Sequence, residues 1–223
     1  MDSLIGPLPD AWSEHRLEEV CEIQAGPSGA SLPSREFGEQ GTPLVRPGDI
    51  ADRRVSDTGL AHVTRTTAGR LRRYRLRSGD IVGTRTGTIG RFALVTSDQR
   101  DWLYSTQLLR VRSSDRIDPV YLVHYLSLPP IQDWIDRHAS GSTVRSLTVD
   151  TLRSLPTALP PLHVQQEIGA SLEALDDKAR LHAEISRTTS ELHDALAPML
   201  FSGRMPVPMV DATPDSSASA AAT

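Results

Sequence analysis

One long stretch without proline or glycine limits the folds that this 223-residue chain can adopt. It runs from Ala170 to Ala197 and follows the Pro160-Pro161 step. Proline has a fixed φ and no N–H, so this step suits the entry to a helix and not its interior. We therefore predict one helix from about Val164 to Leu200, about 36 residues and roughly 54 Å long. Such a helix cannot pack its whole length on a domain of about 150 residues, whose radius of gyration is about 15 Å.

The apolar residues of this predicted helix recur at spacings of three and four, as in a coiled-coil seam diluted by Ala and Thr. Two arrangements stay open: the helix folds back on its own domain, or it pairs with a helix of a second copy or of a partner. The length favours pairing. Gln165 and Gln166 are candidate contacts to a partner or to the second helix, although they could simply cap the helix start. The candidate seam residues are Ile168, Leu172, Leu175, Leu181, Ile185, Leu192 and Leu196.

Before the long helix, turn residues separate short apolar segments. We expect a short helix within residues 1–25 and strands within 43–50, 76–83, 92–95 and 108–112. Two further helices are expected at 119–128 and 131–138. The fold class is therefore α/β (α+β), with a small mixed β-sheet and short helices. The predicted domains are a globular domain at 1–158, the long helix at 159–202 and a disordered tail at 203–223, which is rich in Pro, Ser and Ala.

The net charge of −4 hides a strong asymmetry along the chain. The segment from Arg46 to Arg112 holds fourteen arginines and six aspartates, with no lysine or glutamate, so it carries +8 and the rest of the chain carries −12. Concentrated basic charge is typical of a protein that binds the phosphate backbone of nucleic acid. The alternative is a solvated surface of a generally arginine-rich protein, since Lys178 is the only lysine.

Other bulk features set broad limits. No run approaches the roughly 18 apolar residues of a membrane span, and the first residues lack the basic and apolar regions of a signal peptide. Cys21 is the only cysteine, so no internal disulfide forms. These features fit a cytoplasmic protein without membrane contact.

Three loops and one basic run supply candidate DNA contacts. Arg85 follows an apolar strand between glycines, where it could reach a base or a phosphate, with Thr84 and Thr86 supporting it; a salt bridge to Asp80 or Asp98 is the alternative. The other candidates could equally be a turn, a flexible loop or a solvated face. They are Ser142, Thr143 and Arg145 after Gly141, Ser28 and Ser31 in a loop of small residues, and Arg73 and Arg75 within the run Arg70, Arg72, Arg73, Arg75 and Arg77, which on a strand would share one face.

Taken together and in order, the motifs over about residues 10–200 resemble the DNA-specificity subunits of type I restriction-modification systems. No single motif carries the resemblance; their order and spacing do. The matching pieces are Trp12 with Leu17–Val20, the Gly26 loop, Pro43–Ile50, Gly79–Gly90, Tyr121-Leu122, Gly141–Thr143, Leu159–Leu162 and Gln165–Ile168.

The resemblance also implies a subunit organisation and partners, which the residues by themselves do not indicate. A full subunit of that family has two target-recognition domains, each followed by a long helix, and the helices pair antiparallel. This chain resembles a half-subunit, which implies a homodimer through the C-terminal helix and a bipartite, inverted-repeat DNA site. It also implies partners: a methyltransferase subunit and, in systems that also restrict DNA, an endonuclease subunit. S-adenosylmethionine and ATP with Mg²⁺ would be bound by those partners and not by this chain.

The residues themselves argue against an enzyme. A restriction-type nuclease usually needs a lysine beside paired carboxylates, and Lys178 lies beside Asp176 and Asp177 on the long helix, where a solvated face is expected. A methyltransferase needs a glycine-rich cofactor loop and a polar residue before its Pro-Pro-aromatic step, and Pro160-Pro161 lies between leucines. His182 and His193 are eleven residues apart and form no close metal-ligand pair. A dimerising scaffold without DNA remains the non-enzymatic alternative.

Overall fold

The computed structural model describes residues 3–32, 37–38, 40–141 and 145–204. The chain divides into two compact units, Met1–Asp176 and Asp177–Thr223. The helix α5 (Leu162–Phe201) contributes its first fifteen residues to the first unit and the rest to the second. The predicted tail lies outside the described residues from position 205 onward.

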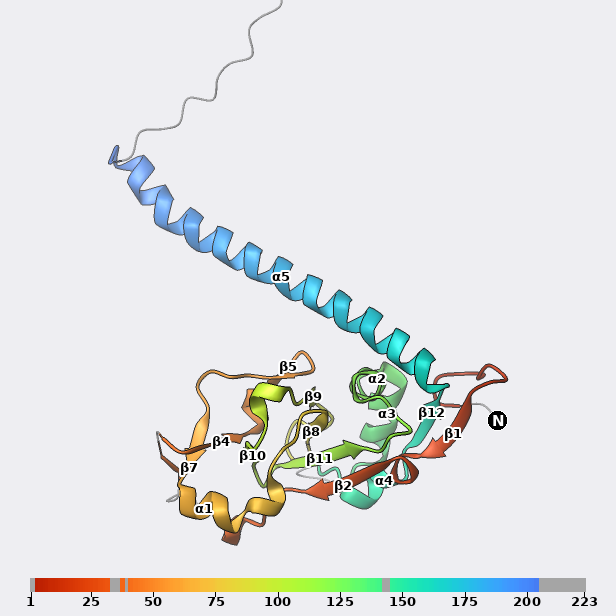
Figure 1. Ribbon diagram of the computed structural model, residues 1–223. Helices are drawn as coiled ribbons and strands as arrows, with labels where there is room; N and C mark the ends of the chain where they lie inside the picture. Colours follow the sequence, from red (N-terminus) through yellow and green to blue (C-terminus); the bar gives the residue numbers. More distant parts are fainter. Residues whose placement is uncertain (1–2, 33–36, 39, 142–144, 205–223) are drawn as a thin grey trace, which may run out of the picture. The chain divides into compact units, whose positions relative to one another are not determined.

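A mixed sheet of six strands forms the centre of the first unit (Figure 1). All neighbouring strands in it pair antiparallel except β6 and β9, which are parallel. Its strands, in spatial order, are β2 (Cys21–Ala25), β11 (Leu108–Ser113), β8 (Asp80–Thr84), β9 (Phe92–Leu94), β6 (Arg54–Val55) and β5 (Ile50–Ala51).

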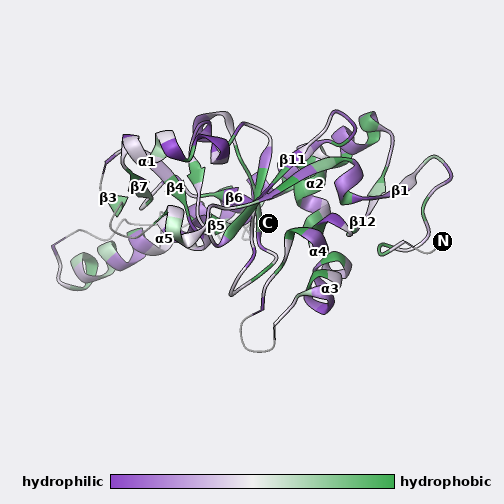
Figure 2. Cartoon of the chain, turned by 90° about the horizontal axis from the view of Figure 1, so that it is seen from below, coloured by the Kyte–Doolittle hydropathy of each residue, from purple (hydrophilic) through white to green (hydrophobic). Residues whose placement is uncertain are grey.

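The sheet separates two hydrophobic clusters because side chains alternate between its faces. In β11, Leu109 and Val111 join the first cluster and Leu108 joins the second. Figure 2 shows the hydrophobic residues concentrated along these strands and on α2. The first cluster is covered by α2 (Pro119–Leu126), α3 (Pro129–His138) and α4 (Val149–Arg153).

The second cluster lies between the six-stranded sheet and a smaller sheet of four strands. A short helix, α1 (Arg65–Arg70), and the 3-10 turn η5 (Arg72–Tyr74) close it, with Leu71, Tyr74 and Leu76 buried in the cluster. The strands of the smaller sheet, in order, are β10 (Leu103–Tyr104), β4 (Thr42–Val45), β7 (Ala61–Val63) and β3 (Phe37–Gly38).

A two-stranded sheet joins the start of the unit to the segment before α5. Strands β1 (Ser13–Arg16) and β12 (Pro156–Leu159) pair antiparallel, and the hydroxyl of Tyr121 donates to the Ala158 carbonyl at 2.9 Å. The predicted N-terminal helix is therefore wrong. All three residues of the predicted helix face belong to the first cluster, but Leu17 lies in the 3-10 turn η1 (Leu17–Glu19), Val20 directly follows it, and Cys21 begins β2.

The predicted fold class is confirmed as a mixed α/β domain with a long C-terminal helix. Helix α5 has 40 residues, about 60 Å in length, and includes Pro198 in its last turn. Every helix in the described part of the chain is too short or too polar to cross a membrane. The remaining 3-10 turns are η2 (Gly29–Ser31), η4 (Pro47–Asp49) and η6 (Ser97–Gln99).

The burial of Cys21 leads to a chemical prediction. Its side chain is 8 % exposed, and burial raises the pKa of the thiol to about 12. Only the thiolate is nucleophilic, and at pH 8 it would be about one part in ten thousand. We expect iodoacetamide to label the native protein at least about a hundredfold more slowly than the guanidinium-unfolded chain. Rapid stoichiometric labelling of the native protein would contradict the buried position.

Candidate nucleic-acid interface

One end of the six-stranded sheet gathers three loops, two of which carry candidate contact residues. Strand β11 is antiparallel to both β2 and β8, so β11 starts at the end where β2 and β8 stop. The loop after β2 touches the loop before β11: a Cβ on Gly26 would overlap the carbonyl of Ser105. The loop after β8 also lies there, since the Arg85 amide donates to the Gln107 carbonyl at 2.9 Å.

A fourth loop, between α3 and α4, joins this end through backbone contacts. Thr86 and Ser146 form an isolated antiparallel bridge, and the Leu147 amide donates to the Arg85 carbonyl at 2.8 Å. Segments about 60 residues apart in the sequence therefore lie side by side. Of the candidates in this fourth loop, Ser142 and Thr143 lie outside the described residues.

Arg85 has neither of the carboxylate partners that the sequence suggested. Asp80 binds Arg112 through two hydrogen bonds of 2.7 Å, and Asp98 accepts a hydrogen bond from Ser97. The half-buried Arg85 side chain keeps a buried Nε without a hydrogen-bond partner in the described part of the chain. An unpaired buried donor costs free energy. Arg85 thus lies in the loop after β8 with a guanidinium that neither Asp80 nor Asp98 neutralises.

The two threonines beside Arg85 have structural roles. Thr84 is fully buried, and its hydroxyl accepts a hydrogen bond from the Arg91 amide at 3.0 Å. Thr86 is half-buried in its bridge to Ser146. Thr84 cannot reach a ligand from the interior, so it supports the loop that presents Arg85.

Arg145 is committed to α3. It donates to the backbone carbonyl of Asp136, and its Nη1 lies 3.4 Å from the Asp136 carboxylate. A cation near a helix C-terminus also interacts favourably with the helix dipole. Its guanidinium thus anchors the fourth loop to the end of α3.

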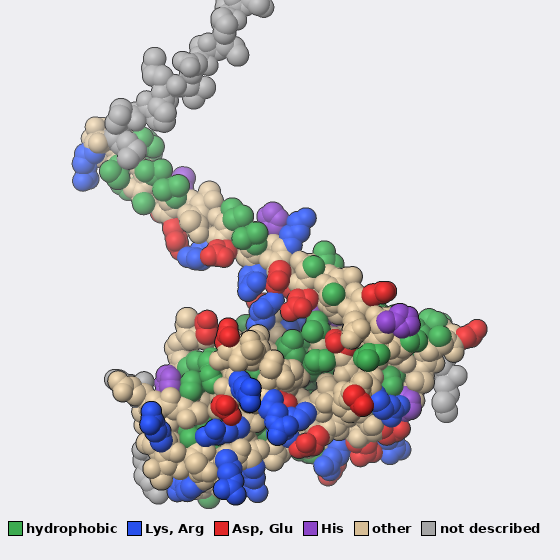
Figure 3. All heavy atoms as spheres, in the orientation of Figure 1, with side chains coloured by type: hydrophobic (Ala, Val, Ile, Leu, Met, Phe, Trp, Pro, Cys, Tyr) green, Lys and Arg blue, Asp and Glu red, His purple; other side chains and the backbone are tan. Residues whose placement is uncertain are grey.

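The arginine run does not lie on a strand, the arrangement in which several of its side chains would share one face, because α1 and η5 occupy residues 65–74. Leu71, Tyr74 and Leu76 point into the second cluster, which leaves the intervening arginines at the surface. Figure 3 shows arginines gathered over the part of the unit that carries α1. We call the following residues the basic surface: Arg65, Arg70, Arg72, Arg73, Arg75, Arg77 and Arg100.

Three adjoining hollows run along the basic surface. They measure about 690, 470 and 220 Å³. The first two share Arg75 and Arg100, and the last two share Arg73. Ser31 lines the third hollow, and its hydroxyl lies 2.8 Å from that of Ser28. The structure thus brings the Ser28–Ser31 loop and the arginine run into one concave strip.

Few carboxylates neutralise the basic surface. Asp101 lies 3.5 Å from Arg75 and 4.0 Å from Arg100, and both pairs are exposed and therefore weak. Arg73 stacks on its neighbour Tyr74, 4.7 Å from the ring centre. Within the described ranges, three members of the surface have no side-chain partner: Arg65, Arg72 and Arg77. A concave cationic strip in which three arginines have no partner among the described residues fits a polyanion.

Along α5, the candidate contact residues fall into two groups. Gln165 is 1 % exposed, and its amide bonds the backbone at Asp118, Arg116 and Pro160. It therefore anchors the helix within its own domain and does not face a partner, whereas Gln166 is exposed. Ile168 packs on the first cluster and Leu172 and Leu196 are half-buried, while the more exposed positions are Leu175, Leu181, Ile185 and Leu192, between 52 % and 62 % exposed.

Of the acidic residues beside Lys178, only Asp176 departs from the expected solvated face, because Asp177 and Lys178 are exposed. Asp176 accepts hydrogen bonds of 2.7 and 2.6 Å from Arg53, and Asp177 accepts one of 3.1 Å from Arg180. Among the described residues, His, Cys, Asp and Glu form no group of three that could hold a metal ion.

Comparison with known protein families shows which family the chain belongs to. Residues 9–188 match the type I restriction modification DNA specificity domain. The chain belongs to that family. The resemblance of its motifs is thereby confirmed. This family of DNA specificity domains is non-catalytic and carries no cofactor.

Curated relatives of this DNA specificity domain are longer than the chain. A putative type I restriction enzyme MjaX specificity subunit of Methanocaldococcus jannaschii is 26 % identical over 78 % of this chain and 41 % of the relative. The type I restriction enzyme EcoBI specificity subunit of Escherichia coli is 25 % identical over 75 % of this chain and 35 % of the relative. The chain thus spans less than half the length of these proteins.

Solved structures support the same fold. A chain from a type I restriction-modification complex matches with a TM-score of 0.64 and 24 % identity, over 85 % of this chain and 45 % of that one. The type I S subunit from M. genitalium gives a TM-score of 0.61 at 15 % identity, over 91 % of this chain and 49 % of that one. At such identities the likeness concerns the fold alone.

Proposed function

We propose that this DNA specificity domain binds double-stranded DNA through the basic surface and the loops at the adjoining end of the sheet. It would thereby direct a type I adenine methyltransferase or restriction complex to its site. The observation that carries the proposal is the concave strip of seven arginines, three of which have no partner among the described residues. Phosphate contacts of this kind position a protein on the duplex, and contacts to base edges supply the sequence.

Within this interface, Arg85 is the proposed base-reading residue. Its guanidinium has no carboxylate partner in the described chain, and a fork of donors is suited to guanine O6 and N7. Thr84 and Thr86 hold its loop from the inside. Arg73, Arg75, Ser28 and Ser31 would contact phosphates, and Arg145 would hold the loop that carries Ser142 and Thr143.

The proposal includes pairing of two copies through α5. The second unit presents Leu181, Ile185 and Leu192 at spacings of four and seven, each more than half exposed. Such a row suits the seam of a coiled coil. Two copies related by a twofold axis would carry two identical recognition domains, so the DNA site would be bipartite and an inverted repeat.

The partners follow from the family. The matched relatives are specificity subunits of type I restriction enzymes. For this chain we propose a methyltransferase subunit as partner and, if the system also restricts DNA, an endonuclease subunit. We propose that they act in the cytoplasm, where chromosomal DNA is accessible. S-adenosylmethionine, ATP and Mg²⁺ would be bound by those subunits. The exposed Gln166 remains a candidate contact to them.

A dimerising scaffold without a DNA role is the competing function, and salt dependence separates the two. Each neutralised phosphate contributes about 0.9 to the slope of log K against log salt. We expect the triple variant Arg65→Gln, Arg72→Gln, Arg77→Gln to lower that slope by about 2 to 3 in DNA-binding titrations between about 50 and 200 mM salt.

The matched control is the triple variant Arg16→Gln, Arg116→Gln, Arg153→Gln. It removes the same charge from exposed positions outside the basic segment, so its slope should stay close to that of the unaltered protein. Equal slopes for both triple variants would refute the proposed surface. No DNA binding by the unaltered protein at low salt would favour the scaffold.

A further inference from the structure

The first turns of α5 are attached to the globular domain near Gln165. Its side chain accepts a hydrogen bond from the Asp118 amide at 2.8 Å and donates to the Pro160 carbonyl at 2.8 Å. One turn later, Gly169 is buried against the start of α2, where a Cβ would lie 3.0 Å from the Tyr121 amide nitrogen. This first attachment fixes a point on the helix but leaves its direction open.

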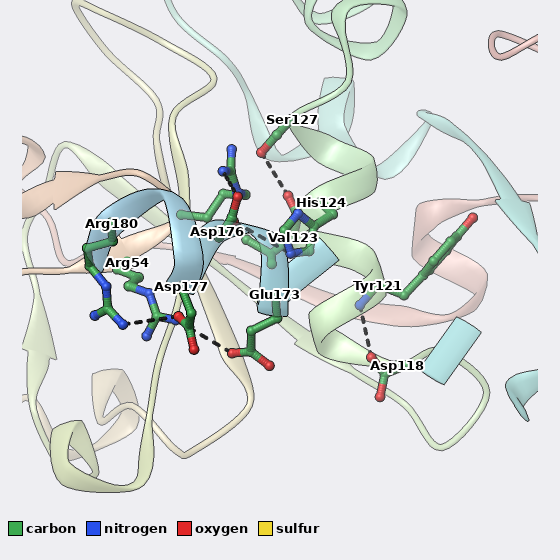
Figure 4. Close-up of polar contacts among 11 residues, drawn as sticks. Arg54, Asp118, Tyr121, Val123, His124, Ser127, Glu173, Asp176, Asp177 and Arg180 are labelled. Atoms are coloured by element: carbon green, nitrogen blue, oxygen red, sulfur yellow. Dashed lines mark hydrogen bonds and ion pairs between the residues drawn. The ribbon is translucent and has the colours of Figure 1, made fainter. Parts of the chain in front are cut away.

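A second attachment lies further along the helix, at Asp176. Arg53 donates two hydrogen bonds to its carboxylate, from Nε at 2.7 Å and from Nη2 at 2.6 Å. His124 on α2 lies 3.8 Å from Asp176, and Arg54 lies 3.9 Å from Glu173; Figure 4 shows these side chains facing one another. The Arg53 guanidinium lowers the pKa of Asp176 below its usual 3.8, so the carboxylate stays charged at neutral pH.

Arg53 holds a backbone conformation that its residue type disfavours. It forms the two-residue tip of the β5–β6 hairpin with Asp52, and their φ angles are +61° and +48°. Such turns favour Asn-Gly, and an arginine in the left-handed region is strained. Strain of this kind marks positions where a side chain is needed. At this position the strained residue is Arg53, and its side chain binds Asp176.

The hairpin tip is in turn fixed to the central sheet. The Leu94 amide of β9 donates to the Arg53 carbonyl at 2.9 Å, and Arg54 pairs with Leu94 in parallel register. The sheet, the hairpin and Asp176 thus form one hydrogen-bonded connection. Gln165 and Asp176 are eleven residues apart, about 16 Å along the axis, so two attachments at this distance define the direction of the part of α5 that belongs to the first unit.

We propose that the Arg53–Asp176 ion pair is a positioning device that sets the direction of α5 on the recognition domain and thereby restricts the spacing between the two half-sites that the complex accepts. This inference rests on the proposed function. A change of one base pair in the spacer rotates one half-site by about 35° relative to the other. A complex with rigidly held helices discriminates against that rotation, whereas a loosened one tolerates it.

The experiment maps N6-methyladenine in cells that express the chain with its methyltransferase subunit. A plasmid library carries the mapped half-sites with the spacer varied one base pair at a time. For the unaltered protein we expect one spacer to be preferred over its neighbours by at least about tenfold, the order of effect of losing one base contact. In R53G, which relieves the backbone strain and removes the ion pair, and in D176N, the preference should fall below about threefold.

Two further variants make the result specific. The exchange R53D with D176R restores an ion pair of opposite orientation, and we expect it to recover the narrow spacing. D150N removes a carboxylate from the exposed pair Asp150–Arg153, remote from α5 in the sequence, and should keep the preference of the unaltered protein. Thermal unfolding of each variant shows that it is folded.

The outcomes distinguish the inference from the function on which it rests. A narrow spacer preference in folded R53G and D176N would overturn the positioning role, as would a loss of methylation at every spacer without any broadening. No chain-dependent methylation by the unaltered protein would instead refute the proposed function. A broadened profile that the charge exchange narrows again would establish the ion pair as the cause, since a merely stabilising contact would not change the preferred spacing.

Discussion

Replacement of Leu181, Ile185 and Leu192 by glutamate is expected to convert the protein from a dimer to a monomer at micromolar concentration. Each of these side chains is more than half exposed in the single chain. Full burial of one exposed Leu or Ile contributes about 1.5–3 kcal/mol, and about half of each side chain is still exposed, so six of them per dimer contribute roughly 5–10 kcal/mol, comparable with the roughly 8 kcal/mol of a micromolar complex. Glutamates in the seam would also repel one another.

Analytical ultracentrifugation over about 1–50 μM is the measurement, chosen to bracket a micromolar dissociation constant. The matched control is Ala183→Glu, Ser186→Glu, Ser190→Glu, which adds the same charge to the same segment off the seam. We expect the control to remain dimeric. A monomeric unaltered protein, or a seam variant that dimerises as well as the control, would contradict pairing through α5.

Arg85→Ala is expected to abolish sequence-selective methylation by the assembled complex while leaving dimerisation intact. A bidentate contact to a base contributes about 1–3 kcal/mol, and a dimer would lose two of them, which gives roughly a hundredfold loss of selectivity or more. The fold should tolerate the change, because the Arg85 side chain has no hydrogen-bond partner in the described chain and its backbone bonds remain.

Arg85→Lys separates charge from geometry in the same assay. Lysine keeps the charge but loses the planar fork, so we expect it to retain non-selective DNA binding and to lose most of the selectivity. Unchanged selectivity in Arg85→Ala would refute the assignment of Arg85 as a base-reading residue. Dimer formation serves as the internal control for both variants.

Several elements could be predicted from the sequence because their signal is local. The segments of β8, β9 and β11 are short apolar runs bounded by turn residues, and the Pro160-Pro161 step marks the start of α5. Strand β1 could not be found in this way, since its sequence is polar and it pairs with residues about 145 positions away. The helical backbone of the arginine run could not be found from the sequence either, because it depends on the burial of Leu71 and Tyr74 in the second cluster.

The candidate interface, too, has features that could be predicted from the sequence and features that could not. Composition indicated that the basic segment binds phosphate, and the positions of Arg73, Arg75 and Arg85 followed from runs and motifs. The residues that surround each of these positions in the folded protein could not be predicted from the sequence. Gln165 looked like a surface contact at a helix start, but its amide satisfies three backbone groups in the interior. Polar residues of this type are placed by the groups that need hydrogen bonds, and these come from distant parts of the chain.

The sequence by itself determined the long helix, the α/β class, the charge asymmetry and, through ordered motifs, the family. These properties depend on local backbone preferences and on composition, which need no partner elsewhere in the chain. Only the tertiary structure decided that Arg85 is free of Asp80, that the loops at 86 and 146 adjoin, and that Arg53 holds Asp176. Each of these depends on which distant side chains and backbone groups meet when the two hydrophobic clusters close, and an ion pair or bridge forms only at that distance.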